Sequence, residues 1–287
     1  MARVEATPAA SNDVSGRGTR GQVASSTTSV EELDLSAWEG TGKFAVVVHG
    51  VFTPEECAAL IARSESAGYE QALVNMGNGQ QMRMLDTRKS DRSIIDDPDF
   101  AEELWQRLRA ATGDDPRLVR RAGRRKGDAA FHACGLNERL RFLRYGPGDF
   151  FASHQDGTYM RRDEAGPERR GECSLLTCQL YLNEGFQGGA TRFHDGYDEA
   201  KGIDVVPRTG SVLLFEHRLL HEGSLLVDGC KYVIRTDVMF TNKGPGWTYA
   251  EKPLPGMSAP PVAAPQPAGH GELDEEKGLK PDNSLHW

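Results

Sequence analysis

The spacing of apolar positions changes about halfway along the chain. Over residues 54–66 and 98–111, apolar side chains recur every three or four positions, as in a helix with one buried face. From residue 140 onward, short apolar runs are separated by glycine-rich turns, which is typical of strands. The pattern predicts an α+β chain in which two N-terminal helices buttress a β-rich half.

Both predicted helices begin with recognisable start signals. Thr53, Pro54 and Glu56 combine an N-cap hydroxyl, a proline at the first helical position and a glutamate at the third. This combination is a capping box with a favoured first-turn proline. Asp97 and Pro98 repeat the signal before the second helix. We therefore expect helices to begin at these two prolines.

The predicted strands indicate a sandwich or a barrel, because they are short and joined by glycine-rich turns. Along the last of them, Lys231 and Arg235 share one side and the apolar residues share the other, since a strand alternates its faces. The predicted strands cover residues 44–48, 140–145, 175–182, 211–215 and 232–240.

Composition divides the chain into four parts. Residues 1–35 contain almost no large apolar side chains, so they are expected to form a disordered N-terminal tail. Residues 40–135 form an N-terminal support region with helices, and residues 136–245 form the core. Residues 250–287 are rich in proline and are expected to be a C-terminal tail.

Charge and cysteine content narrow the class of protein. The chain has 287 residues and a formal net charge of −8, so nucleic-acid binding over the whole surface is unfavourable. No apolar run reaches the roughly 18–20 residues of a membrane span. The five cysteines form no Cys-x-x-Cys pair, and the first residues do not resemble a signal peptide. We expect a cytoplasmic protein without a disulfide framework.

A metal-ligand pattern follows one predicted strand. His154 and Asp156 are two positions apart, so a strand presents both on the same side. One further imidazole would give two histidines and one carboxylate with open coordination positions, the set used by non-haem Fe(II) oxygenases. His221 and His217 are the candidates for the third ligand. His221 is preferred, because Lys231 follows it by ten residues on the next strand.

A 2-oxo acid co-substrate would explain the cations on the last strand. Such a compound chelates iron at one end, and its distal carboxylate needs a fixed cation in a partly dry pocket. Lys231 and Arg235 are four residues apart and can both face inward. Inward cations are costly without an anion, and Asp237 could be an internal partner for one of them.

Six short motifs follow one another along the chain. They are residues 52–57 (FTPEEC), 88–90 (RKS), 145–156 (YGPGDFFASHQD), 177–183 (TCQLYLN), 188–193 (GGATRF) and the stretch from His221 to Lys231. In this order and spacing, they resemble the prolyl 4-hydroxylase-type branch of the Fe(II)/2-oxoglutarate dioxygenases. The resemblance covers roughly residues 50 to 242 and implies a double-stranded β-helix, or jelly-roll, core.

The resemblance also implies a role for individual residues. His154, Asp156 and His221 would bind Fe(II), and Lys231 would hold the far carboxylate of 2-oxoglutarate. Thr177 would donate its hydroxyl to the same carboxylate, and Tyr145 would bond the co-substrate from another strand. Arg235 departs from the pattern and is the rival anchor. The implied cofactors are Fe(2+) and 2-oxoglutarate, with ascorbate as an accessory candidate.

The implied reaction is hydroxylation of an unactivated C–H bond, with a prolyl residue of a peptide or protein as the candidate substrate. Succinate and CO2 would be released. The alternatives are a small-molecule hydroxylase, a non-catalytic peptide-binding module on the same barrel, and a cupin-like metalloenzyme. Intact ligand positions oppose the binding module, and a cupin has no need of Lys231.

Six cations gather in the ten residues 117–126. A solvated loop is the simpler interpretation of this run. A patch for an acidic or phosphorylated substrate is the functional alternative.

Overall fold

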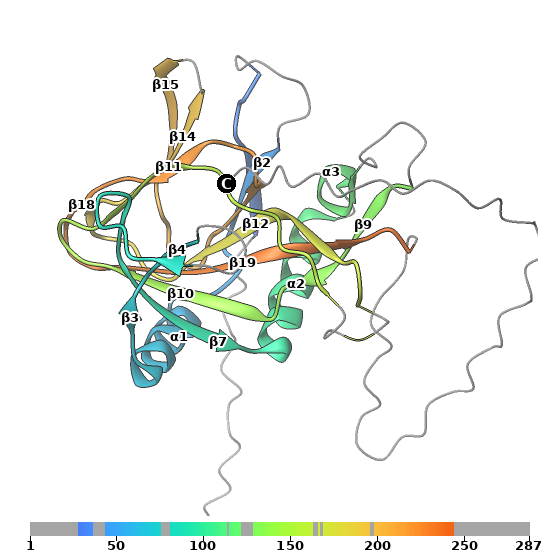
Figure 1. Cartoon of the computed structure of the whole chain (residues 1–287), viewed down its shortest axis with the longest axis horizontal. Helices are drawn as coiled ribbons and strands as arrows, with labels where there is room; N and C mark the ends of the chain where they lie inside the picture. Colours follow the sequence, from blue (N-terminus) through green and yellow to red (C-terminus); the bar gives the residue numbers. More distant parts are fainter. Residues whose placement is uncertain are drawn as a thin grey trace, which may run out of the picture.

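A large antiparallel sheet and a smaller one face each other at the centre of the molecule (Figure 1). The computed structural model describes residues 28–36, 44–75, 81–113, 115–121, 129–162, 166, 169–195 and 198–243. The expected tail segments 1–27 and 250–287 lie outside the described residues.

The large sheet has the order β1-β2-β16-β12-β19-β10-β7-β3, and β9 joins it by pairing with β19 and β8. Along this order the strands are β1 (Ser29–Glu32), β2 (Ala45–His49), β16 (Val212–Glu216), β12 (Cys173–Tyr181), β19 (Lys231–Thr241), β10 (Arg139–Tyr145), β7 (Asp91–Asp96) and β3 (Glu70–Gln71). The two remaining strands are β8 (Arg120–Arg121) and β9 (Phe131–Leu136).

The smaller sheet has the order β15-β14-β17-β11-β6. Along this order the strands are β15 (Asp198–Val205), β14 (Thr191–Asp195), β17 (His221–Gly223), β11 (Phe150–His154) and β6 (Arg88–Lys89). Two further pairs complete the described strands, β13 (Gln187–Gly188) with β18 (Leu226–Asp228) and β4 (Val74–Asn75) with β5 (Gln81–Met82).

From β10 onward the chain passes repeatedly between the two sheets. β10, β12, β16 and β19 belong to the large sheet, whereas β11, β14, β15 and β17 belong to the smaller one. Every pairing among these eight strands is antiparallel. This is the double-stranded β-helix expected from the sequence, and it makes the fold α+β.

Two helices cover the outer face of the large sheet. Helices α1 (Pro54–Ala67) and α2 (Pro98–Thr112) begin at the two predicted prolines. They lie on the side of β10, β12 and β19 away from the smaller sheet (Figure 1). A short helix, α3 (Pro116–Val119), follows α2.

The predicted capping box is present at the start of α1. The Thr53 hydroxyl accepts a hydrogen bond from the Glu56 backbone N–H at 3.2 Å, and the Glu56 carboxylate accepts one from the Thr53 N–H at 2.8 Å. Asp97 caps α2 by accepting from the Phe100 N–H at 2.9 Å. Both caps satisfy backbone donors that a helix N-terminus leaves open.

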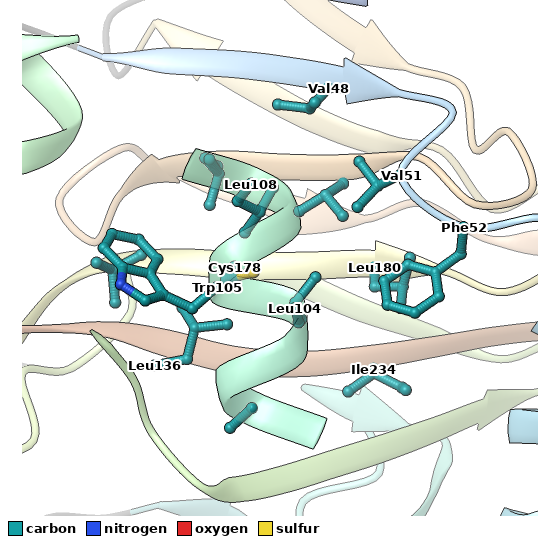
Figure 2. Packing of buried hydrophobic residues seen from close by; sticks show 14 of the residues in the cluster. Val48, Val51, Phe52, Leu104, Trp105, Leu108, Leu136, Cys178, Leu180 and Ile234 are labelled. Carbon is teal, nitrogen blue, oxygen red and sulfur yellow. The ribbon is translucent and has the colours of Figure 1, made fainter. Parts of the chain in front are cut away.

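The first core cluster lies between α2 and the large sheet (Figure 2). Leu104 and Leu108 are fully buried and Trp105 is 5% exposed, so one face of α2 is inside. The strands beneath them contribute Cys178 and Leu180 from β12. Burying this face fixes the large sheet from behind.

The second core cluster lies between the two sheets. It contains Tyr145, Tyr181, Val233, Phe193 and Phe215, which come from both sheets. Along β19 the residues therefore alternate as predicted: Tyr232, Ile234, Val238 and Phe240 belong to the cluster under the helices, and Val233 belongs to the cluster between the sheets. Lys231 and Arg235 share the inner face with Val233.

The prediction of a disordered tail over residues 1–35 is wrong for residues 29–35. β1 pairs with β2 over four residues, from Ser29 opposite His49 to Glu32 opposite Val46. Leu33 and Leu35 follow it and are buried. An edge strand is held largely by backbone hydrogen bonds, so its exposed polar side chains gave no apolar pattern to detect.

Among the described residues, no helix has the length and apolar character that a membrane crossing needs.

Candidate active site

Three potential metal ligands meet between the sheets. His154 ends β11, Asp156 follows two residues later, and His221 begins β17, directly opposite His154. One ligand atom from each lies within 4.8 Å of the other two. The two imidazole rings are 4.3 Å apart between centroids. Residues 67 positions apart are thus brought together because β11 and β17 are paired neighbours in the smaller sheet.

The backbone fixes the tautomer of both histidines. Nδ1 of His154 bonds the Ala152 carbonyl at 2.8 Å, and Nδ1 of His221 bonds the Leu219 carbonyl at 2.9 Å. Each Nδ1 is therefore the donor, and each Nε2 keeps a lone pair facing Asp156. Burial, with the neighbouring His221, lowers the pKa of His154 to about 4, and burial also lowers the pKa of His221. Both imidazoles are neutral at physiological pH, as metal ligands must be.

Asp156 is ionised and oriented by its neighbours. Burial would raise its pKa, but Arg235 and then the two histidines hold that pKa well below its usual value. The Thr177 hydroxyl donates to Oδ2 at 2.5 Å, and Arg235 Nη2 lies 3.0 Å from Oδ1. The carboxylate faces both imidazoles, with Nε2 distances of 3.8 Å to His154 and 3.7 Å to His221.

His217, the rival third ligand, lies behind this group. Its Nδ1 bonds the Thr177 hydroxyl at 2.9 Å, and its Nε2 bonds the Ser174 hydroxyl at 2.9 Å. Both ring nitrogens are therefore occupied, and His217 is not one of the three grouped residues. The geometry favours His221 and gives His217 a supporting place behind Asp156 and Thr177.

Lys231 is a buried cation without a carboxylate partner among the described residues. It is 3% exposed, and its ammonium donates to the Gly189 carbonyl at 2.5 Å. The rings of Tyr145 and Tyr181 lie 5.3 and 5.8 Å from Nζ. Burial alone lowers the pKa of Lys231 to about 7. A bound anion would strongly favour the charged form of Lys231 in this buried setting.

Polar side chains from three strands lie in the core between the two sheets. Gln179 and Tyr181 share the inner face of β12, and both donate to the Thr191 hydroxyl of β14, at 3.0 and 2.9 Å. The Tyr145 hydroxyl lies 3.9 Å from the position of a Cβ built on Gly223 of β17. These groups sit among apolar residues of the core between the sheets.

Thr177 and Arg235 both interact with side chains of the protein itself. Thr177 lies opposite Asp237, six residues from Lys231 along β19, which is roughly 20 Å at strand spacing. Its hydroxyl serves Asp156 instead, so it cannot share a co-substrate carboxylate with Lys231. Arg235 is occupied by Asp156 and, at 3.2 Å, by Asp237. Of the two rival anchors, Lys231 is the one without a carboxylate partner among the described residues.

The sequence analysis gave no individual role to two arginines and a phenylalanine that lie at the site. Arg141 lies opposite Arg235 on the neighbouring strand, and its alternation with Tyr145 along β10 was a usable signal. Arg88 lies over the Phe151 ring at 4.6 Å, and Phe151 stacks on His154 with a centroid distance of 3.7 Å. The stacking of Arg88, Phe151 and His154 could not be predicted from the sequence, because it depends on the pairing of β6 with β11.

Two of the three described arginines of the basic run, Arg117 and Arg121, form ion pairs within the structure. Arg117 pairs with Glu32 and Asp115, and Arg121 pairs with Glu216 at 2.8 Å. Arg124, Arg125 and Lys126 lie outside the described residues. The described part therefore ties α3 and β8 to β1 and β16.

The donor set fits Fe(II) and a 2-oxo acid. Two neutral imidazole nitrogens and one carboxylate are the donors of a non-haem iron site with open positions. The buried ammonium of Lys231, which has no carboxylate partner among the described residues, fits the distal carboxylate of 2-oxoglutarate.

Comparison with known proteins agrees with this chemistry. Residues 140–236 match the family model of the 2OG-Fe(II) oxygenase superfamily. That segment contains His154, Asp156, His221 and Lys231. A search of curated proteins gave no match.

Similar solved structures include three prolyl hydroxylases. The viral collagen prolyl hydroxylase of Paramecium bursaria Chlorella virus-1, in complex with 2-oxoglutarate, is 19% identical (69% of this chain, 97% of that one, TM-score 0.44). A Pseudomonas putida prolyl-4-hydroxylase is 20% identical (74% and 96%, TM-score 0.45). The Trichoplax adhaerens prolyl hydroxylase, in complex with a hypoxia-inducible-factor peptide, is 17% identical (68% and 82%, TM-score 0.45).

The family match and the donor set point to the same chemistry. Residues 140–236 match the 2OG-Fe(II) oxygenase superfamily and contain a donor set that fits an Fe(II)- and 2-oxoglutarate-dependent dioxygenase.

Proposed function

We propose that this dioxygenase hydroxylates an unactivated C–H bond of a prolyl residue, with release of succinate and CO2. The observation that carries the reaction class is the group of His154, Asp156 and His221, whose ligand atoms lie within 4.8 Å. The prolyl part of the proposal is supported by the resemblance of residues 145–156, 177–183 and 188–193 to prolyl 4-hydroxylase-type enzymes. A small-molecule substrate is the alternative on the same site.

The three residues of that group are the proposed metal ligands. Fe(II) with 2-oxoglutarate supplies the oxidising chemistry when bound, and the protein supplies orientation and shielding. Nε2 of each histidine and one oxygen of Asp156 face the shared position, while Thr177 and Arg235 keep the carboxylate from rotating. Lys231 is the proposed anchor for the distal carboxylate of 2-oxoglutarate.

The core between the sheets keeps bulk water from the co-substrate. Phe193 and Phe215 are fully buried and pack at right angles to each other, with a centroid distance of 5.1 Å. Phe215 also contacts the His221 ring, at 4.7 Å. A dry wall at this position strengthens the ion pair that Lys231 would form with a carboxylate.

Succinate formation from 2-oxoglutarate tests the proposed ligands. We expect wild-type protein to form succinate only when Fe(II), 2-oxoglutarate and dioxygen are all present. The variant His154→Ala loses one ligand and should fall to background, whereas His132→Ala, on β9, should retain the activity. Turnover by His154→Ala at the wild-type rate would contradict the ligand assignment.

The prolyl assignment needs its own measurement. Proline-containing peptides should increase succinate release above the uncoupled rate, and mass spectrometry should find one added oxygen on proline. Oxygen added only to small metabolites would favour the alternative.

A further inference from the structure

Three arginines surround the candidate metal group. Arg141 and Arg235 are cross-strand neighbours on β10 and β19, on the face toward the smaller sheet. Arg88 comes from β6 of the smaller sheet and lies over Phe151, which in turn stacks on His154. Guanidinium groups from three strands, belonging to both sheets, thus converge beside the metal-ligand group.

Arg141 differs from Arg235 in how it is partnered. Arg235 is held between Asp156 and Asp237, at 3.0 and 3.2 Å. Arg141 Nη1 lies 3.5 Å from Asp237 Oδ2 and makes no hydrogen bond to the described residues. The Arg141 side chain is 29% exposed as a whole, while its Nη1 is buried, so the residue lies at the border between the core and solvent. A guanidinium placed in this way presents a planar set of donors to an incoming group.

The charges around this cluster do not balance. Arginine stays protonated in proteins, so Arg88, Arg141 and Arg235 contribute three positive charges. Among the described residues, the carboxylates that face them are Asp156 and Asp237. Fe(II) and the dianion of 2-oxoglutarate cancel each other and leave the excess unchanged. Burial, and then the positive charge of Arg235, lowers the pKa of Arg141, so a further anion would be favourable here.

The co-substrate does not account for this excess. Lys231, its proposed anchor, is four residues from Arg235 on the same face of β19, or roughly 13 Å along the strand. The distal carboxylate of 2-oxoglutarate is therefore directed away from Arg141. The ligand left to supply an anion at Arg141 is the primary substrate.

We propose that Arg141, with Arg88 and Arg235 beside it, binds a carboxylate of the primary substrate. This inference rests on the proposed function and adds a substrate class to it: a prolyl substrate that carries a negative charge close to the carbon that is hydroxylated. Paired hydrogen bonds from guanidinium to carboxylate would fix the distance and the angle of that carbon. The carboxylate can be the C-terminus of a short peptide or an acidic side chain next to proline.

Matched probes separate these two sources. The first pair is acetyl-Ala-Pro with a free carboxylate and the same dipeptide as its amide. The second pair is the end-blocked tetrapeptide Ala-Pro-Asp-Ala and its Asn counterpart. We measure substrate-stimulated succinate release by wild-type enzyme and expect a charged member to act at a KM roughly 10- to 100-fold below its neutral partner. The pair that shows the difference identifies the source.

The variant Arg141→Gln tests the residue itself. It should raise the KM of the charged probe by roughly 10- to 100-fold and remove its advantage over the neutral probe. Arg139→Gln is the matched control, because Arg139 is on the same strand and pairs with exposed Asp96 at 3.4 Å. It should leave the charge preference intact.

Three results would overturn the carboxylate site: equal KM values within both pairs, no response to either charged probe, or an Arg141→Gln effect confined to the apparent affinity for the co-substrate. Failure of the proposed function would look different, because wild-type enzyme would then form no succinate, whether or not a probe is present.

Discussion

At the residue scale, the sequence was most informative where two functional residues are close in the chain. His154 and Asp156 could be paired from strand alternation alone. His221 had to be chosen over His217, and only the pairing of β11 with β17 places it opposite His154. Thr177 was expected beside the co-substrate carboxylate, whereas the structure places its hydroxyl against Asp156, because its register against β19 cannot be read from one sequence.

The depressed pKa of Lys231 predicts a pH dependence of co-substrate binding. The free enzyme loses the Lys231 proton near pH 7, whereas the bound dianion requires the ammonium. The dissociation constant for the co-substrate should therefore be constant below pH 7 and rise by about tenfold per pH unit above it, until the raised pKa of the complex is reached. Calorimetric titration between pH 6 and 9 measures this profile.

The variant Lys231→Arg is the control for that profile. Arginine stays protonated across the range, so binding by this variant should not weaken above pH 7. A rise of equal slope in Lys231→Arg would show that another group is responsible.

At the scale of single elements, strong local signals predicted position and orientation. The two helices begin at the expected prolines, and the inward and outward faces of β19 are as predicted. β1 and the short strands of the smaller sheet were missed, because edge pairing and sheet membership depend on distant partners rather than on local apolar patterns.

Helix α2 should be a main contributor to stability. Leu108 is fully buried against the large sheet, so Leu108→Ala should lower the free energy of unfolding by about 2–5 kcal/mol. The neighbouring exposed Arg109→Ala should change it by less than about 0.5 kcal/mol. Urea unfolding followed by circular dichroism compares the two. A Leu108→Ala loss no larger than the control would contradict the packing described for this face.

At the scale of the whole molecule, one sheet has two separate tasks. Its outer face is covered by α1 and α2, while its inner face supplies Lys231, Arg235, Thr177 and Arg141 to the candidate active site. Residues before the predicted core also belong to this sheet, because β2 and β7 pair with β16 and β10. The support region therefore holds the strands that carry the site.

Metal binding should stabilise the folded chain. A ligand that binds only the native state at 100 times its Kd adds about 2.7 kcal/mol. Mn(II), used as a redox-stable probe, should therefore raise the unfolding midpoint of wild-type protein by several degrees and have no effect on Asp156→Ala. Equal shifts in both proteins would place the metal elsewhere.

The central claim is that His154, Asp156 and His221 hold one Fe(II) with 2-oxoglutarate beside it. Anaerobic addition of Fe(II) and then 2-oxoglutarate, followed by visible absorption, tests this most directly. We predict a weak visible band that saturates at one Fe(II) per chain in wild-type protein and in His132→Ala, and that is absent in His221→Ala. A band of full strength in His221→Ala, or none in wild-type protein, would contradict the account.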